Sequence, residues 1–177
     1  MNRATVYNVI KKERDYQDMN WSHLGHDPLV KQYHYAAPHI LMIEDYARKA
    51  QALWTKSKDE VDVLQTIAKL ATIAVRALEE TIDKDGKTLS RPGVFMAIDA
   101  ERASQDITHP RTKDNAGQYK FSAPHLLLVE EYAARARNWW KNGDRDGVIR
   151  TFVVLAAILV RALEEIDGPD LLYVGLR

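Results

Sequence analysis

The sequence predicts an all-α protein, and three observations lead to that prediction. Apolar residues recur at helical spacing across most of the 177 residues and almost never alternate strictly. Hydrophobic residues make up 46% of the chain and cysteine is absent, so a sizeable core can form without disulfide bonds. The third observation is an internal repeat, because residues 32–39 (QYHYAAPH) recur at 118–125 (QYKFSAPH).

The repeat extends over most of the chain, and nine of the eleven positions in its last segment are identical. The spacing between copies shortens slightly along the chain, as tandem duplication with short loop deletions would produce. We therefore expect two three-helix repeats, residues 1–88 and 89–177, joined near residues 84–92. The further matching segments are 6–18 with 94–106, 40–50 with 126–136, and 70–80 with 155–165.

The first helix of each repeat is predicted at roughly 4–18 and 93–106. Val6, Val9 and Ile10 share one apolar face of the first of these helices. The second copy repeats these positions as Val94, Ala97 and Ile98.

The second helix of each repeat is predicted to begin at an Ala-Pro dipeptide, at 37–38 and again at 123–124. Proline is tolerated in a first helical turn, where its missing N–H has no helical partner to lose. The Ser122 hydroxyl is expected to cap the second copy. Both helices are expected to end near a tryptophan, Trp54 or Trp140.

The third helix is predicted at roughly 59–83 and 145–166, where the stop sequences DKDG (83–86) and DGP (167–169) end the apolar pattern. Residues 153–160 have no polar face, so protein must surround them. We therefore expect the two repeats to pack against each other as one pseudo-twofold bundle with a shared core. The candidate N-caps are Asp59, Asp144 and Asp146.

Charge and hydropathy limit the classes of partner. The chain has 25 Lys and Arg against 25 Asp and Glu, so no net charge attracts nucleic acid. The longest uncharged apolar run, residues 152–160, is about half of a bilayer span, and residues 1–12 lack a signal peptide's apolar core. We expect a cytoplasmic protein with no nucleic-acid or membrane partner.

One polar constellation recurs with all four side chains unchanged, although the residues around it differ between the copies. A solvated helix face with an Arg–Asp pair is the structural alternative. Because all four side chains are kept while their neighbours vary, we expect them to contact a ligand. The constellation is Glu13, Arg14, Gln17 and Asp18, repeated as Glu101, Arg102, Gln105 and Asp106.

A second constellation follows the Ala-Pro dipeptides, where His39 and His125 occupy a first helical turn suited to holding an anion. A packing or capping histidine is the alternative of about equal weight. Glu44 is expected to pair with Arg48. The Arg-Ala-Leu-Glu-Glu segments at 76–80 and 161–165 are interpreted as solvated helix ends. The candidate ligand residues of this second constellation are His39, Glu44, Arg48, His125 and Glu130, with Trp21 as a stacking ring.

These segments together resemble the MazG-like members of the all-α nucleoside triphosphate pyrophosphohydrolases, especially small phage-encoded ones. The resemblance rests on Glu-Arg-x-x-Gln-Asp in the first helix, two adjacent acids in the second and the Leu-Glu ending of the third, in both repeats. It implies a helical bundle that binds a nucleotide. In active members, acids on two helices hold Mg²⁺, and the enzyme cleaves between the α and β phosphates.

The chain departs from the active pattern at the metal site. The third acid of the second helix is Arg48 or Ala134, and the third helices place Lys69 and Arg150 where acids are expected. Such a site would hold Mg²⁺ poorly, whereas these cations would contact phosphates directly. The resemblance therefore implies a non-catalytic nucleotide-binding protein without a cofactor, which sequesters a nucleotide or nucleotide signal in the host cytosol if it is phage-encoded.

Two alternatives remain open. The first is an Mg²⁺-dependent pyrophosphohydrolase with a metal site of different register. The acids of that site would be Glu13, Glu44, Asp45 and Glu79, or their copies Glu101, Glu130, Glu131 and Glu164. The second is a structural or protein-binding helical module. In each case we expect a homodimer, formed through Trp139 and Trp140 or through residues 171–176.

Overall fold

The computed structural model describes residues 1–21, 34–57 and 60–166. Within these ranges the chain forms six α-helices, one short 3-10 helix and no strand, which confirms the predicted all-α class. The elements are α1 (Arg3–Trp21), α2 (Ala36–Ser57), α3 (Glu60–Glu80), α4 (Arg91–Thr108), η3 (Gln118–Lys120), α5 (Ser122–Lys141) and α6 (Arg145–Glu165).

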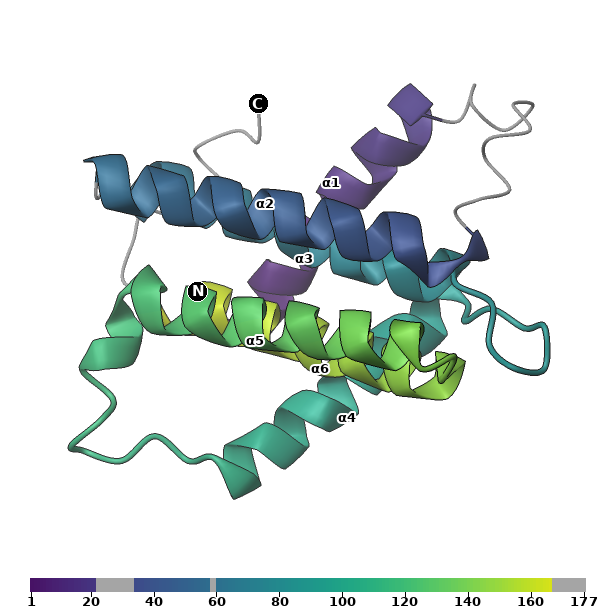
Figure 1. Ribbon diagram of the computed structural model, residues 1–177. Helices are drawn as coiled ribbons and strands as arrows, with labels where there is room; N and C mark the ends of the chain where they lie inside the picture. The colour runs from purple at the N-terminus through teal and green to yellow at the C-terminus, as the bar shows by residue number, and fades with distance from the viewer. Residues whose placement is uncertain (22–33, 58–59, 167–177) are drawn as a thin grey trace.

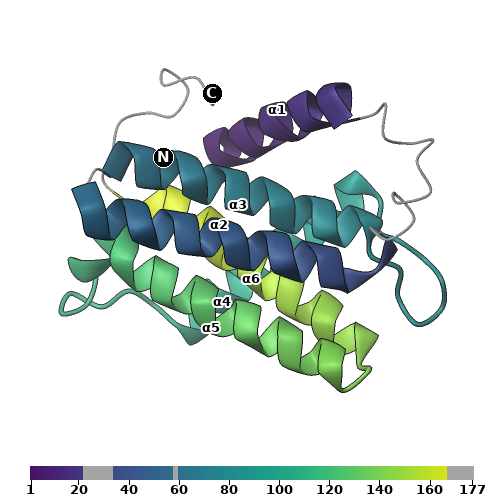
Figure 2. The ribbon, with the colours of Figure 1, turned by 45° about the horizontal axis from the view of Figure 1, so that its top comes forward.

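The helices are stacked in layers of two. The middle layer holds α3 and α6, which contact each other, and α2 and α5 pack side by side over one face of it (Figures 1 and 2). Both α1 and α4 cross the middle layer obliquely, and each contacts α3 as well as α6. We call α1 to α3 the first half and α4 to α6 the second half. Neither half has a core that is separate from the other.

The apolar run of α6 explains this packing. Phe152 and residues 155–160 are buried, as their lack of a polar face predicts. Val153 and Val154 are only partly buried, so the expectation that protein surrounds the whole run from 153 to 160 is wrong at its first two positions. Val154 lies in a groove between α5 and α6.

The helix ends follow local chemistry that was only partly predicted. Asp144 caps α6 as expected, because its carboxylate accepts a hydrogen bond from the Gly147 N–H at 2.7 Å. Ser122 does not cap α5, since the helix begins at Ser122 itself and Phe121 occupies the cap position. Ser90, which was not predicted, caps α4. The predicted cap Asp59 and the stop sequence 167–169 lie outside the described residues.

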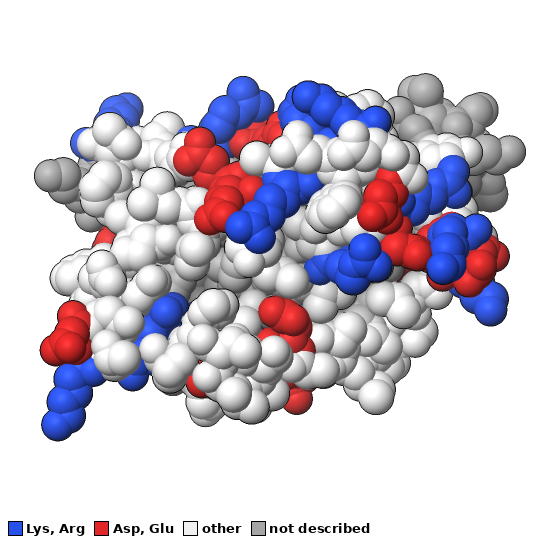
Figure 3. All heavy atoms as spheres, turned by 60° about the horizontal axis from the view of Figure 1, so that its bottom comes forward, with Lys and Arg blue, Asp and Glu red and all other residues white. Residues whose placement is uncertain are grey.

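The surface is mixed in charge. Figure 3 shows Lys and Arg side chains beside Asp and Glu over much of one face, with wide uncharged areas between them. Among the described helices, none has the length and apolar character that crossing a membrane requires.

Candidate functional site

The repeated polar residues of α1 meet the end of α3 in a buried ion network. The Arg14 guanidinium donates to Glu79 at 2.9 Å and also pairs with Asp18. Arg91, the first residue of α4, donates to Glu79 at 2.5 Å and to Asp18 at 2.7 Å. Only 6% of the Arg14 side chain and 11% of the Glu79 side chain are exposed. This network therefore joins the first half to the start of the second.

The second half has the same network at the end of α6. Arg102 donates to Glu164 at 2.8 Å and to Asp106 at 2.9 Å. Here the additional arginine is Arg3, which belongs to α1 and donates to Glu164 at 2.7 Å and to Asp106 at 3.1 Å. Each half therefore supplies the arginine that completes the ion network of the other.

Sequence reasoning missed Arg3 and Arg91, although a signal for them exists. The two arginines occupy corresponding places three residues before the matched segments that begin at Val6 and Val94. Extending the repeat comparison by one turn of helix would have paired them. It would not have shown that each arginine reaches into the opposite half, since that contact depends on tertiary packing.

One expectation about these charges is wrong, and one alternative holds only in part. The constellation on α1 and α4 is not a solvated face, because Glu13, Arg14 and Gln17 are buried and so are their counterparts Arg102 and Gln105. The Arg–Asp pair of that alternative does form in both copies. The ends of α3 and α6 are not solvated either, since α1 and α4 cover them. Arg161 is 6% exposed, and its Nε donates to Glu165 at 2.7 Å, as Arg76 does to Glu80 at 2.8 Å.

The two histidines are buried beside carboxylates. His39 is fully buried with its Nε2 3.5 Å from Glu80, and His125 is 1% exposed with its Nε2 3.6 Å from Glu165. His125 also contacts the Tyr119 carbonyl at 3.0 Å, and burial lowers the pKa of its ring. Both rings are buried, as the packing alternative expects, while His125 also lines a cavity, so anion binding by these histidines stays a prediction.

The carboxylates beside these histidines differ in their surroundings. Burial raises the pKa of Glu80 above its ordinary value, even though Arg76 and Arg14 oppose that effect. Burial also acts on Glu165, but hydrogen bonds from Arg111 and Arg161 outweigh it and lower the pKa of that group. Arg111 donates to Glu165 at 2.8 Å and lies 3.3 Å above the Tyr119 ring.

A cavity of about 520 Å³ opens next to this second cluster, between α4, the segment 108–121, α5 and α6. Two of the predicted ligand residues on α4, Glu101 and Gln105, face it, and Gln105 donates to Glu101 at 3.0 Å. Aromatic, amide and guanidinium groups therefore meet around a space large enough for a small ligand. The lining includes Glu101, Gln105, His109, Arg111, Tyr119, His125, Tyr132, Ile158 and Arg161.

The corresponding pair in the first half is Glu13 and Gln17, where Gln17 donates to Glu13 at 3.3 Å. The buried Gln17 side-chain oxygen has no hydrogen-bond partner among the described residues. Trp21 ends α1, but its side chain, which we expected to stack on a ligand, lies outside the described part of the structure.

The remaining predicted residues lie elsewhere, on the seam between α2 and α5. Glu44 pairs there with Arg137 and not with Arg48, and Glu130 accepts a hydrogen bond from Gln51 at 3.2 Å. Arg48 donates instead to the Glu44 backbone carbonyl at 3.3 Å. Glu44, Arg48 and Glu130 line a separate cavity of about 380 Å³. The structure therefore divides the predicted ligand residues among three places: the cavity beside α4, the α2–α5 seam, and the end of α3 in the first half.

Most of the acids proposed for a metal are paired with basic side chains, Glu130 excepted. Asp45 pairs with Lys49 at 2.7 Å, and Glu131 pairs with Arg135. Among the described residues, no three His, Asp or Glu side chains converge as a metal site would require. Glu79 and Glu164, which the enzyme alternative needs, are bound to Arg14 and Arg102.

Comparison of the chain with protein-family models, curated proteins and solved structures finds no match in any of the three.

Proposed function

We propose that the protein binds a nucleotide or a nucleotide-derived small molecule without cleaving it. The observation that carries the proposal is the cavity beside α4, whose lining combines the Tyr119 and Tyr132 rings with Gln105, Arg111 and Arg161. Rings of this kind bind a base, amides select among its polar edges, and guanidinium groups bind phosphate. Arg111 and Arg161 both donate to Glu165, so a phosphate bound here shares them with that carboxylate.

The pairing of the acids supports binding over hydrolysis. Hydrolysis of the MazG type needs carboxylates that are available to Mg²⁺. Three of the four acids on α2 and α5 that would bind the metal contact Lys49, Arg135 or Arg137, and the fourth, Glu130, accepts a hydrogen bond from Gln51. Descent from the MazG-like pyrophosphohydrolases is a proposal that rests on the sequence motifs alone. Sequestration of a nucleotide in a host cell's cytosol is likewise a proposal.

We also propose that the two halves are tandem repeats related by an approximate twofold axis. Reciprocal contacts support this. Tyr7 and Phe95, which occupy corresponding positions, meet with ring centroids 5.3 Å apart. Arg3 and Arg91 exchange partners across the halves. On the seam, Glu44 contacts Arg137 while Glu130 contacts Gln51, which is the residue corresponding to Arg137.

Binding is tested by thermal unfolding with a panel of mono-, di-, tri- and cyclic nucleotides. Ligand at a hundred times its dissociation constant should stabilise the fold by about 2.7 kcal/mol, which raises Tm by roughly 5–10 °C. Leu128→Trp should fill the cavity and remove the shift. Leu127→Trp is the matched control, because Leu127 is 67% exposed. Wild-type melting that no nucleotide changes, or equal shifts in both variants, would overturn the proposal.

The enzyme alternative has a separate assay. Pyrophosphate released in the presence of Mg²⁺ or Mn²⁺, and abolished by Glu44→Gln combined with Glu130→Gln, would establish it. Catalysis by this route requires Arg137 to leave Glu44, so the binding proposal expects no release above the background of the double variant.

A structural role is favoured by one specific observation. Four side chains of the constellation form the ion pairs of the two networks, which explains why they are repeated even without a ligand. They are Arg14, Asp18, Arg102 and Asp106. If the whole constellation is structural, Glu13→Ala and Glu101→Ala change stability and leave nucleotide affinity unchanged. If the cavity binds a nucleotide, Glu101→Ala changes affinity.

The predicted homodimer remains a proposal that rests on the exposure of Trp139 and Trp140. The alternative surface, residues 171–176, lies outside the described residues. Light scattering at micromolar concentration distinguishes a dimer from a single 20.2 kDa species.

A further inference from the structure

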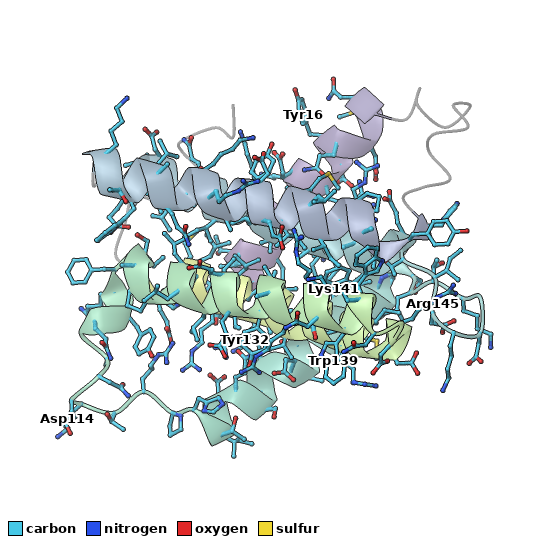
Figure 4. All side chains as sticks on the ribbon, in the orientation of Figure 1. Tyr16, Asp114, Tyr132, Trp139, Lys141 and Arg145 are labelled. Carbon is cyan, nitrogen blue, oxygen red and sulfur yellow. The ribbon has the colours of Figure 1, made fainter. Side chains whose placement is uncertain are left out.

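A second open groove, of about 550 Å³, follows the outer side of α5 and α6 in the second half. From α5, Tyr132, Arg135 and Trp139 point into it, since spacings of three and four place them on one helix face. Figure 4 shows Tyr132 and Trp139 along the same side of α5. From α6, Arg150 and Val154 form the opposite wall.

The charge of this groove is of one sign. Arg135 and Arg150 are the charged residues that line it, while their partners Glu131 and Asp144 lie outside the lining. Both pairs are exposed, with 53% of the Arg135 side chain and 68% of the Arg150 side chain accessible. Exposed pairs contribute little stability, so either guanidinium can turn to an anionic ligand at low cost.

The aromatic wall lies against α6. A Cβ on residue 147 would lie 2.8 Å from Cδ2 of Trp139, so the absence of a side chain at Gly147 lets the indole lie against α6. The Trp139 side chain keeps 42% of its surface exposed. The Arg135 guanidinium lies 4.6 Å from the centre of the Tyr132 ring. A partly exposed indole in a groove lined by two arginines suits a planar ring that carries a negative group.

The first half keeps only part of this set at the corresponding positions. Tyr46 and Lys49 stand where the second half has Tyr132 and Arg135. The indole, the second arginine and the glycine are replaced by Leu53, Gln65 and Asp62. These three groups of the groove are therefore not a by-product of the repeated fold.

We propose that the α5–α6 groove is a second binding site, for an aromatic phosphate whose ring stacks on Trp139 and whose phosphate contacts Arg135 and Arg150. Tyr132 and Val154 line both this groove and the cavity beside α4. The two sites therefore adjoin, and a long ligand occupies both. Only this last step rests on the proposed function, because the groove has its own ring and its own cations.

Titration with AMP, monitored by calorimetry, tests the groove, with inorganic phosphate as the probe that lacks a ring. Arg150→Gln and Trp139→Leu install the residue of the first half at each position, and each should weaken AMP binding at least tenfold. Lys141→Gln removes an exposed charge that lies outside the lining and should leave the affinity unchanged. Melting curves of the variants check that the fold is retained.

The outcomes separate the two proposals. AMP binding lost in Arg150→Gln and Trp139→Leu but kept in Leu128→Trp supports the groove even if the cavity beside α4 binds nothing. Loss in Leu128→Trp alone overturns the groove and leaves the proposed function standing. If AMP binds no more tightly than inorganic phosphate, or does not bind at all, the groove as an aromatic phosphate site is wrong.

Discussion

The ends of α3 and α6 carry the same charged groups in different surroundings. At both ends, two arginines neutralise a buried glutamate, and a histidine lies beside the next one. In the second half Arg111 adds a further pair to Glu165, and the pKa of that carboxyl falls; the pKa of Glu80 rises. Residues that repeat hold the fold in both halves. Residues that differ give the second half its own chemistry.

The largest expected effect comes from the buried arginines. Arg14→Met and Arg102→Met should each lower the free energy of unfolding by about 3–5 kcal/mol, because removing one partner of a buried pair leaves the other charge uncompensated. Urea unfolding followed by circular dichroism measures both. Lys12→Met is the exposed control on α1. A loss in one half only would mean that the two networks are not equivalent.

Replacing Arg3 or Arg91, the arginines that each half supplies to the other, should lower the free energy of unfolding by less. Arg91→Gln and Arg3→Gln are each expected to cost about 1–2 kcal/mol, since both side chains are about one-third exposed and solvent weakens their pairs. A double-mutant cycle of Arg91→Gln with Glu79→Gln should give a coupling energy of about 1 kcal/mol. Additive effects would show that the contact between halves adds no stability.

The smallest expected effect is a difference between Glu165 and Glu80 in how their contribution to stability depends on pH. The folded pKa of Glu165 lies below its unfolded value, so its stabilising contribution is present above the unfolded pKa and is lost as pH falls through the folded pKa. Glu165→Gln should therefore cost about 1 kcal/mol at pH 7 and less in acid.

Glu80 is expected to behave in the opposite way. Because burial raises its pKa, the folded state binds the proton more tightly, and the charged form is disfavoured above that pKa. Glu80→Gln should therefore cost less than Glu165→Gln at pH 7. The free energy of unfolding of both variants is measured from pH 4 to pH 8. Identical pH profiles would show that Glu80 and Glu165 do not differ in this respect.

Local signals made much of the fold predictable. Helical periodicity and the positions of Ala-Pro, Asp and Gly predicted six helices with bounds close to the observed ones. They succeed because helix starts and stops depend on residues only a few positions away. Ser122 was misassigned because a shift of one residue moves a hydroxyl from the cap into the first turn.

The candidate site was less predictable. The sequence marked Glu101, Gln105 and His125, which line one cavity, but grouped them with Glu44 and Glu130 on a different surface. His39 and Glu44 are five residues apart, so they point in different directions on α2. Burial at the ends of α3 and α6 depends on α1 and α4 crossing them, and periodicity within one helix carries no information about such crossings.

The exchange of arginines also bears on the order in which the chain is synthesised. Arg91 follows its partner Glu79 by 12 residues, so the first network can close soon after α4 leaves the ribosome. Arg3 precedes its partner Glu164 by 161 residues. The second network therefore closes only when the last described helix has been made, and closing so long a loop slows folding. Until α6 emerges, Arg3 has only its exposed partners on α4, Asp99 and Asp106, and the place of Glu164 is open to other carboxylates, including those of a neighbouring nascent chain.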